Sequence, residues 1–459
     1  MKSPETAHLA SGRSYPDSAG VAGGRAIWQE AGRVYISERP RQDSGSSGRV
    51  ALASRRVAPT VLLLGLVSLL TDVSSESVSA ILPVYLTAVL GLTPLAYGFI
   101  DGLYQGVSAL VRILGGWYAD RTDRPKWVAF VGYGMSAATK LLLVPLHGFV
   151  ALTAVITLDR LGKGLRTGPR DALIAAATPP ESLGRAFGVH RALDTAGAAI
   201  GPLLAFSILL LVPGDYTSVF VASFAAAVLG LGVLGLVVPD LRPRRASGDS
   251  GRLRVRPSVR VMARSGMGRL VVAAALLSVL AISDGFLYLS LQQRDDFAAT
   301  WFPLLFVGTN VAYFALAVPM GRLADRVGRQ KVLVGGHLLL LGAYLAAAGP
   351  TGGVFATAVC LLLLGAFYAA TDGVLAALTS SLVPASVRAA GIATTQTVVA
   401  VSRFASSLLF GVLWATFGRA PAVYVYAALL LAAIPVAWWL LKSLRASGRS
   451  PEDTDKGTG

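Results

Sequence analysis

A cluster of charges interrupts one of the most apolar parts of this chain. The stretch TLDRLGKGLRTGPRDAL, residues 157–173, places Asp159, Arg160 and Lys163 between the apolar runs FVALTAVI and IAAAT. On a helix, Asp159 and Lys163 stand in the favourable acid-first i,i+4 order. A charge at the centre of a bilayer costs at least about 2.5 kcal/mol, so such groups turn inward, form pairs and usually serve a function.

Acids suited to proton exchange occur in neighbouring apolar segments. The stretch SLLTDVSSESVSAILP, residues 68–83, places Asp72 and Glu76 one helical turn apart, and Asp194 follows His190 by one turn. Burial favours the protonated form of a carboxyl group, whereas a nearby arginine favours the ionised form. We therefore predict Asp72 and Glu76 as proton carriers with Arg160 as their modulator, and we group Asp159, Lys163 and Asp194 with them. A purely structural network of ion pairs is the alternative.

Composition places these charges in a membrane protein. The chain has 459 residues, of which 54% are hydrophobic and 14% are charged, and its mean hydropathy is +0.61. A soluble domain carries about a quarter charged residues. The single cysteine, Cys360, and four scattered histidines form no metal-ligand pattern. We expect no metal and no cofactor.

Apolar stretches long enough to cross a bilayer recur along the chain. A membrane helix needs about 20 residues. We predict an all-α membrane protein with twelve transmembrane helices in two six-helix bundles. The predicted spans are 60–90, 97–118, 127–146, 149–170, 187–212, 218–238, 270–291, 301–320, 332–349, 354–378, 390–415 and 421–441.

The distribution of basic residues predicts the orientation. Lysine and arginine gather in alternate connections, which the positive-inside rule places in the cytoplasm together with both termini. The formal charge of +16 is therefore a topology signal, and we expect the cell membrane as location and no nucleic-acid partner. The predicted segments are a disordered tail (1–58), a first bundle (59–238), a basic linker (239–269), a second bundle (270–441) and a tail (442–459).

Two loops repeat. GGWYADRTDRPKWV (115–128) matches MGRLADRVGRQKVL (320–333), and their aspartates Asp120 and Asp325 lie 325 − 120 = 205 residues apart. Both loops resemble the cytoplasmic signature G-x-x-x-D-R-x-G-R-R/K (motif A) of the major facilitator superfamily. The first copy departs from it at Asp123 and Pro125. The resemblance implies two repeated bundles that rock about a substrate site between them.

The same resemblance implies a conformational latch. A glycine allows close helix contact, and an aspartate can face a helix N-terminus or an arginine of the other half. Asp120 is then expected near the start of the eleventh span, with Arg388 and Arg403 as candidate partners. The alternative is that the loop charges only set topology. The latch residues are Gly116, Asp120, Arg121, Arg124, Gly321, Asp325, Arg326, Arg329 and Arg403.

Two further signatures match in part. Gly188, Gly197 and Gly201-Pro202 in the fifth span resemble the antiporter signature (motif C) of proton-coupled exporters, although Ala205 and Phe206 replace its last glycines. Plain helix packing by small residues is the alternative. In the fourth span, Arg160 followed by Gly164 resembles motif B, whose membrane arginine is linked to proton transfer. On a helix, Arg160, Lys163, Gly164 and Thr167 share one face.

The resemblance favours a prokaryotic, proton-coupled antiporter that exports small molecules or drugs. The alternative is a proton symporter that imports a small organic anion or metabolite, which the excess of bases on the fourth span favours, and a non-transporting sensor on the same fold comes third. We expect a monomer. We also expect no enzymatic activity, because no nucleophile-base pair is evident. The predicted cavity residues are Asp101, Arg191, Asp284 and Asp372.

Overall fold

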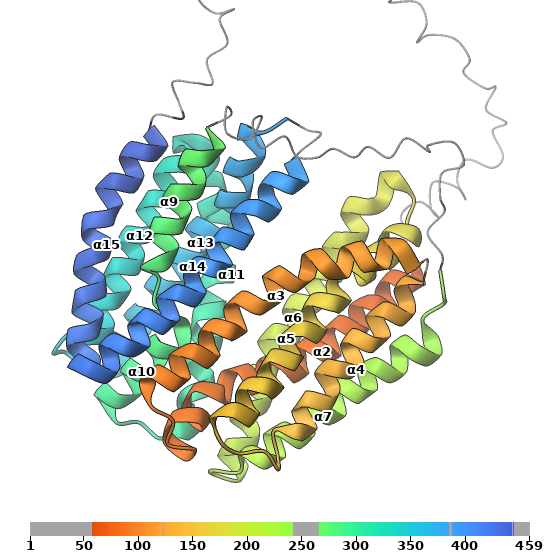
Figure 1. The fold of residues 1–459 in the computed structure, drawn as a ribbon, viewed down its shortest axis with the longest axis horizontal. Coiled ribbons are helices and arrows are strands. Elements are labelled where there is room, and N and C mark those ends of the chain that lie inside the picture. Colours follow the sequence, from red (N-terminus) through yellow and green to blue (C-terminus); the bar gives the residue numbers. More distant parts are fainter. Residues whose placement is uncertain (1–56, 123, 242–265, 385–387, 443, 445–459) are drawn as a thin grey trace, which may run out of the picture. The chain divides into compact units, whose positions relative to one another are not determined.

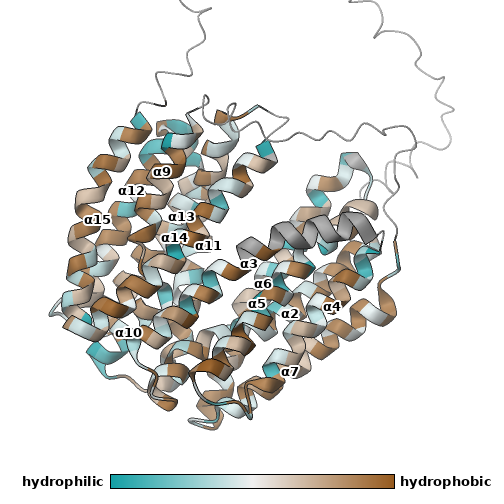
Figure 2. Cartoon of the chain, in the orientation of Figure 1, coloured by the Kyte–Doolittle hydropathy of each residue, from teal (hydrophilic) through white to brown (hydrophobic). Residues whose placement is uncertain are grey.

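The structure is a computed structural model that describes residues 57–122, 124–241, 266–384, 388–442 and 444. All regular elements within these ranges are helices. Most of the predicted N-terminal tail, linker and C-terminal tail, namely residues 1–56, 242–265 and 445–459, lies outside the described residues. Figure 2 shows that apolar residues dominate the length of the helices.

Six long helices make up the first half of the described chain (Figure 1). Proline begins α2 and α4, where a missing backbone N–H costs nothing. Asp215 caps α7 by accepting a hydrogen bond of 3.1 Å from the Ser218 backbone N–H. The helices are α2 (Pro59–Val84, extended by a π-helical turn Tyr85–Val89), α3 (Pro94–Thr122), α4 (Pro125–Leu142), α5 (Phe149–Ala176), α6 (Leu183–Leu211) and α7 (Tyr216–Gly232).

The second half repeats this arrangement with one additional break. Gly328, with φ of +106°, and Gly418, with φ of +86°, adopt backbone conformations that favour glycine and separate consecutive helices. The helices are α9 (Met267–Val279), α10 (Asp284–Asp295), α11 (Phe302–Val327), α12 (Arg329–Ala348), α13 (Val354–Leu382), α14 (Arg388–Phe417) and α15 (Arg419–Lys442).

The seventh span is interrupted, whereas the sequence predicts one continuous helix over 270–291. Between α9 and α10, the Tyr344 hydroxyl donates to the Leu280 carbonyl at 2.9 Å and accepts from the Ile282 N–H at 2.7 Å. The Ser406 hydroxyl donates to the Ala281 carbonyl at 2.8 Å. Unwound backbone is tolerated at membrane depth when protein groups satisfy it. The continuous helix is therefore a wrong prediction at residues 280–283.

The predicted membrane fold is confirmed. Nine helical segments of the described chain are long and apolar enough to cross a membrane, and the more polar α3, α4 and α5 complete twelve spans when α9 and α10 count as one. Helix α2 packs on α6 and α7, and α5 packs on α3 and α4. In the second half, α13 packs on α11 and α12, while α9 packs on α14 and α15. These contacts define two bundles of six spans.

The two bundles contact each other through the beginnings of α3 and α11 and the ends of α6 and α14. A methyl group added at Gly98 of α3 would lie 3.3 Å from the Cα of Gly411 in α14, so the two backbones approach closely there. The rings of Phe206 and Trp301 meet at 5.4 Å between α6 and the turn before α11. In an alternating helical topology, these helix ends lie on the same side of the membrane.

Candidate functional site: charged residues inside the helical bundles

Helix α5 carries a stripe of bases through the first bundle. Arg160, Lys163, Arg166 and Arg170 recur every three or four residues, which places them on one face about 120° wide. Arg160 and Arg166 are buried. The guanidinium of Arg160 stacks 3.7 Å from the ring centre of Tyr104 in α3. This stripe of bases therefore points into the bundle, and the apolar residues of α5 lie on the rest of the helix surface.

Asp159 is the most completely paired acid of the network. Its Oδ1 lies 2.8 Å from Lys140 Nζ and accepts a hydrogen bond of 3.2 Å from the Thr139 hydroxyl. Its Oδ2 accepts from the guanidinium of Arg160, with Nε at 2.9 Å. The favourable i,i+4 order of Asp159 and Lys163 does not lead to an ion pair between them, since α4 supplies the lysine that binds Asp159 and Lys163 turns to α2.

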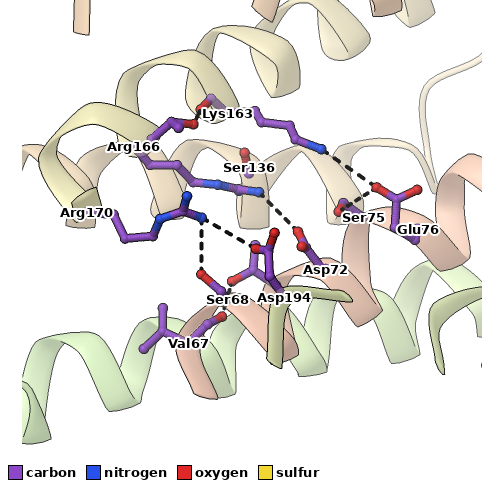
Figure 3. Close-up of polar contacts among 12 residues, drawn as sticks. Val67, Ser68, Asp72, Ser75, Glu76, Ser136, Lys163, Arg166, Arg170 and Asp194 are labelled. Carbon is purple, nitrogen blue, oxygen red and sulfur yellow. Dashed lines mark hydrogen bonds and ion pairs between the residues drawn. The ribbon is translucent and has the colours of Figure 1, made fainter. Parts of the chain in front are cut away.

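Three bases of α5 face α2 and α6 in register (Figure 3). Lys163 Nζ lies 3.7 Å from Glu76 Oε1, and Arg166 Nη2 lies 4.0 Å from Asp72 Oδ1. One turn further, Arg170 Nη1 donates to the Ser68 hydroxyl at 3.2 Å. Residue numbers rise along α5 as they fall along α2, so the two helices form an antiparallel ladder of polar contacts.

Helix α6 closes this ladder with a third acid. Asp194 lies 3.5 Å from Arg170 Nη1 and 3.3 Å from Arg191 Nη1. Figure 3 shows Asp194 and Asp72 on the same side of the arginines. Arg170 also lies 3.0 Å from Asp171. Asp194 therefore shares one base with the ladder and has a second base, Arg191, whose side chain is 77% exposed.

Sequence reasoning counts Arg166, Arg170 and Lys140 among the charges of the membrane spans but assigns none of them an individual role, although these bases hold much of the network. Arg166 lies over the ring of Tyr133 at 4.7 Å, and its Nη1 has no hydrogen-bond partner among the described residues. The helical spacing from Arg160 could have identified Arg166 and Arg170. No local signal identifies Lys140, because its partner lies on another helix.

The glycines of α6 do not act alike. A methyl group at Gly201 would lie 2.8 Å from the Ser77 backbone nitrogen and 2.9 Å from the Glu76 Cβ, so α6 packs tightly on α2 there. Gly197 likewise faces the backbone of Leu69, and Pro202 is buried. At Gly188 the predicted close packing is wrong, because no described atom lies within 4 Å of an added methyl group.

The four predicted cavity residues line three adjoining cavities. A cavity of 220 Å³ holds Asp101 and Asp284 together with Glu76. A second, of 300 Å³, shares Asp284 and adds Asp372, and a third, of 430 Å³, shares Asp372 and adds Arg191. Both bundles line each of these cavities.

Hydrogen bonds hold two of the cavity acids. Asp101 Oδ2 accepts from the Ser407 hydroxyl at 2.6 Å, which joins α3 to α14 across the two bundles. Asp284 accepts from the Tyr368 hydroxyl. Among the described residues, no group of three or more His, Cys, Asp or Glu side chains has the arrangement of a metal site. The polar lining of the cavities includes carboxylates, hydroxyls and amides, together with the guanidinium groups of Arg191 and Arg403.

Arg403 lies in this region and away from the loops, although the sequence assigns it to the latch. It lines the 430 and 300 Å³ cavities. Its guanidinium lies 5.6 Å from the ring centre of Tyr368. The expected partner, Asp120, lies outside the residues whose side chains are described, as do Gly116 and Arg121.

The second loop signature is described and shows a local ion pair. Arg329 Nη2 lies 3.4 Å from Asp325 Oδ1, and Arg329 Nη1 donates to the Ala377 carbonyl at 3.2 Å. An added methyl group at Gly321 would meet no described atom within 4 Å, so the close helix contact expected at this glycine is absent. Arg124, at the start of α4, and Arg326 are exposed.

Comparison with known proteins assigns the chain to a family. The model of the Major Facilitator Superfamily matches residues 64–307 and 294–458. The chain belongs to the Major Facilitator Superfamily. An uncharacterized MFS-type transporter of Methanocaldococcus jannaschii is 30% identical over 369 residues, which are 78% of this chain and 89% of that protein. The MFS-type transporter YfnC of Bacillus subtilis is 25% identical over 72% of this chain and 80% of its own length.

Solved MFS structures share the fold. The nucleoside transporter NupG has a TM-score of 0.69 at 15% identity, covering 84% of this chain and 99% of its own. A bacterial homologue of the human lysosomal transporter Spinster, in an inward-facing and unoccupied conformation, has a TM-score of 0.68 at 15% identity and covers 85% of this chain and 98% of its own. This MFS member is therefore a multi-pass membrane protein of a transporter family. Membership of that family argues against an enzymatic activity.

Proposed function

We propose that the protein is a proton-coupled antiporter that exports small molecules, with Asp72 and Glu76 as the groups that take up and release the proton. Their loose pairing supports this assignment. Asp72 and Glu76 lie 4.0 and 3.7 Å from their bases, and their side chains are 15% and 27% exposed. Asp159, by contrast, is buried and bound at 2.8 Å by Lys140 and also by Arg160. Loosely held acids can exchange a proton, whereas Asp159 is held by two cations and orients Arg160.

The packing of α6 supports coupling between proton binding and helix movement. Gly201 lies against Val73, Glu76 and Ser77 of α2, with an added methyl group 2.9 Å from the Glu76 Cβ. A shift of α6 therefore acts directly on a carrier of the proton. The glycine-proline pair that resembles the antiporter signature lies at this contact, which favours export.

Import of an organic anion by symport is the second candidate. Helix α5 carries four bases and two acids, so this helix has an excess of two positive charges. Both candidates use the same proton carriers, and they differ in the direction in which the solute moves.

We further propose that both termini are cytoplasmic and that the protein resides in the cell membrane. The contacts between the two bundles at the start of α3 and the end of α14 would then lie on the outer side. An opening toward the cytoplasm fits the open surroundings of Gly321 and the exposed pair of Asp325 and Arg329, because a latch on that side would be released.

Transport by purified protein in liposomes tests the proposal. Asp72→Asn and Glu76→Gln should each abolish substrate-driven proton flux, while the control Asp296→Asn should not, because Asp296 is exposed and asparagine tolerates its φ of +48°. Thermal unfolding of each variant shows whether it folds. Undiminished proton flux in both folded variants would remove Asp72 and Glu76 as carriers.

Direction is tested in cells. In a drug-sensitive bacterial host, export should raise tolerance to toxic compounds and lower their accumulation, and Glu76→Gln should cancel this protection. Proton-driven uptake of labelled organic acids without any gain in tolerance would favour the symporter.

A further inference from the structure

Arg403 is a membrane-embedded base without an anionic partner in the described structure. It stands in the middle of α14, and its Nε is buried with no hydrogen-bond partner. Within the described ranges, no carboxylate oxygen lies within 4.0 Å of its guanidinium nitrogens. The guanidinium lies 5.6 Å from the centre of the Tyr368 ring.

Three bases of α5 differ from Arg403 because each of them has an acidic partner. Lys163, Arg166 and Arg170 each have an acid within 4.0 Å. The side chain of Arg403 is partly exposed where it lines the cavities. A charge without a paired acid is unfavourable inside a membrane protein, and a contact with an aromatic ring offsets part of this. A base kept in such a place is expected to receive its partner from solution when the protein works.

The surroundings of Arg403 can accept such a partner. It lines a cavity of 430 Å³, a volume within the range of small-molecule sites. Arg191 from α6 of the first bundle lines the same cavity, and Asp372 supplies its one carboxylate, so the charged lining has an excess of one positive charge. The amide of Gln396 and the ring of Phe367 add a hydrogen-bond donor and an apolar wall.

We propose that Arg403 binds the acidic group of the transported solute, and that this solute is an amphipathic organic anion bearing a carboxylate. The planar guanidinium matches a carboxylate in geometry and charge. An apolar body would pack on Phe367, and Arg191 would approach the same anion from the other bundle. The inference rests on the proposed function only in identifying the ligand as the transported solute.

The neighbouring acids make this site selective. Asp284 and Asp372 line the adjoining 300 Å³ cavity together with Arg403. A cationic group placed at the guanidinium would be repelled by Arg403 and Arg191, and a second negative charge on the solute would be repelled by Asp284 and Asp372. The favoured ligand therefore carries one negative charge.

Binding to the full-length protein in detergent tests this. Phenylbutyrate, phenylbutylamine and phenylbutanol share one apolar body and carry a negative, a positive and no charge. Calorimetry should detect phenylbutyrate alone. Arg403→Gln should weaken it by about tenfold or more, which is about 1.4 kcal/mol per factor of ten. Arg403→Lys should bind with intermediate affinity. The control Lys442→Gln removes the same charge from the exposed end of α15 and should leave binding unchanged.

Several results would overturn the inference. They are equal binding by Arg403→Gln and the unaltered protein, tighter binding of the amine than of the acid, and no binding of phenylbutyrate to the folded protein. If Arg403→Gln does not fold, equal affinities of Arg403→Lys and the unaltered protein decide against it. The binding assay contains no membrane gradient, so it is independent of the transport assay in liposomes. Anion binding without proton flux in liposomes would refute proton-coupled export and keep this inference. Proton flux without anion binding would refute this inference and keep proton-coupled export.

Discussion

Removing the charge of Asp159 is expected to destabilise the protein more than removing the charge of Lys140. Lys140 Nζ and Asp159 Oδ1 lie 2.8 Å apart, which corresponds to a gross attraction of about 6 kcal/mol at an effective dielectric constant of about 20. Desolvation cancels much of this attraction. Asp159→Asn leaves two buried cations, Lys140 and Arg160, around a neutral amide, and breaking a buried pair in this way costs about 3–5 kcal/mol.

Lys140→Met has a smaller cost because Asp159 keeps its other donors. The Arg160 guanidinium and the Thr139 hydroxyl still donate to its carboxylate. The loss is then that of one hydrogen bond to a charged group, about 1.5–3 kcal/mol. In the double variant, Asp159→Asn no longer leaves a lysine unpaired. The double variant should therefore be destabilised by about 1–3 kcal/mol less than the sum of the two single variants.

Unfolding of the purified single and double variants in mixed micelles measures these free energies. Asp296→Asn is the matched control, because it makes the same chemical change at an exposed position and should leave stability unaltered. Equal costs for the two single variants, or strict additivity in the double variant, would show that Asp159 is not held by Lys140 and Arg160 together. The structural role assigned to Asp159 would then be wrong.

Three further variants probe packing and capping. Gly201→Ala should lower the free energy of unfolding by about 1–3 kcal/mol and slow transport, because its methyl group would lie 2.8 Å from the Ser77 backbone nitrogen. The control Gly188→Ala should be tolerated. Equal melting temperatures for the two variants would contradict this. Asp215→Ala should lower the melting temperature at neutral pH by removing the cap of α7. The hydrogen bond from Ser218 lowers the pKa of the Asp215 carboxyl, so its stabilisation is complete above the unfolded pKa of about 3.9 and is lost as pH falls through the lower folded pKa. The difference between the two proteins should therefore shrink on acidification below about pH 4, and a constant difference would refute this role.

The spans could be predicted because their cause is local. An apolar run of about 20 residues is sufficient to indicate a membrane helix, and the predicted span 60–90 corresponds to α2 (Pro59–Val84) and the π-helical turn that follows it. The types of the charged residues were equally visible. Intramembrane acids at 72 and 76 and bases at 160 and 163 needed no structure to be recognised as unusual.

Pairing could not be predicted because it depends on helix rotation and register. The choice of Lys140 as the partner of Asp159, instead of Lys163, follows from how α4 crosses α5. Likewise, Gly188 and Gly201 belong to one sequence pattern, yet α2 passes close to Gly201 alone of the two. A family signature suggested a loop contact for Arg403, and the depth of this residue within α14 places it at the cavities.

The interruption between α9 and α10 depends on residues that are distant in the sequence. One phenol oxygen, that of Tyr344, both receives the Ile282 N–H and serves the Leu280 carbonyl, at separations of 62 and 64 residues along the chain. The break between α9 and α10 is thus satisfied by side chains of α12 and α14 and not by the segment that bends. Loss of the Tyr344 hydroxyl would therefore leave two backbone groups of the bend without this partner, although the sequence of the bend is unchanged.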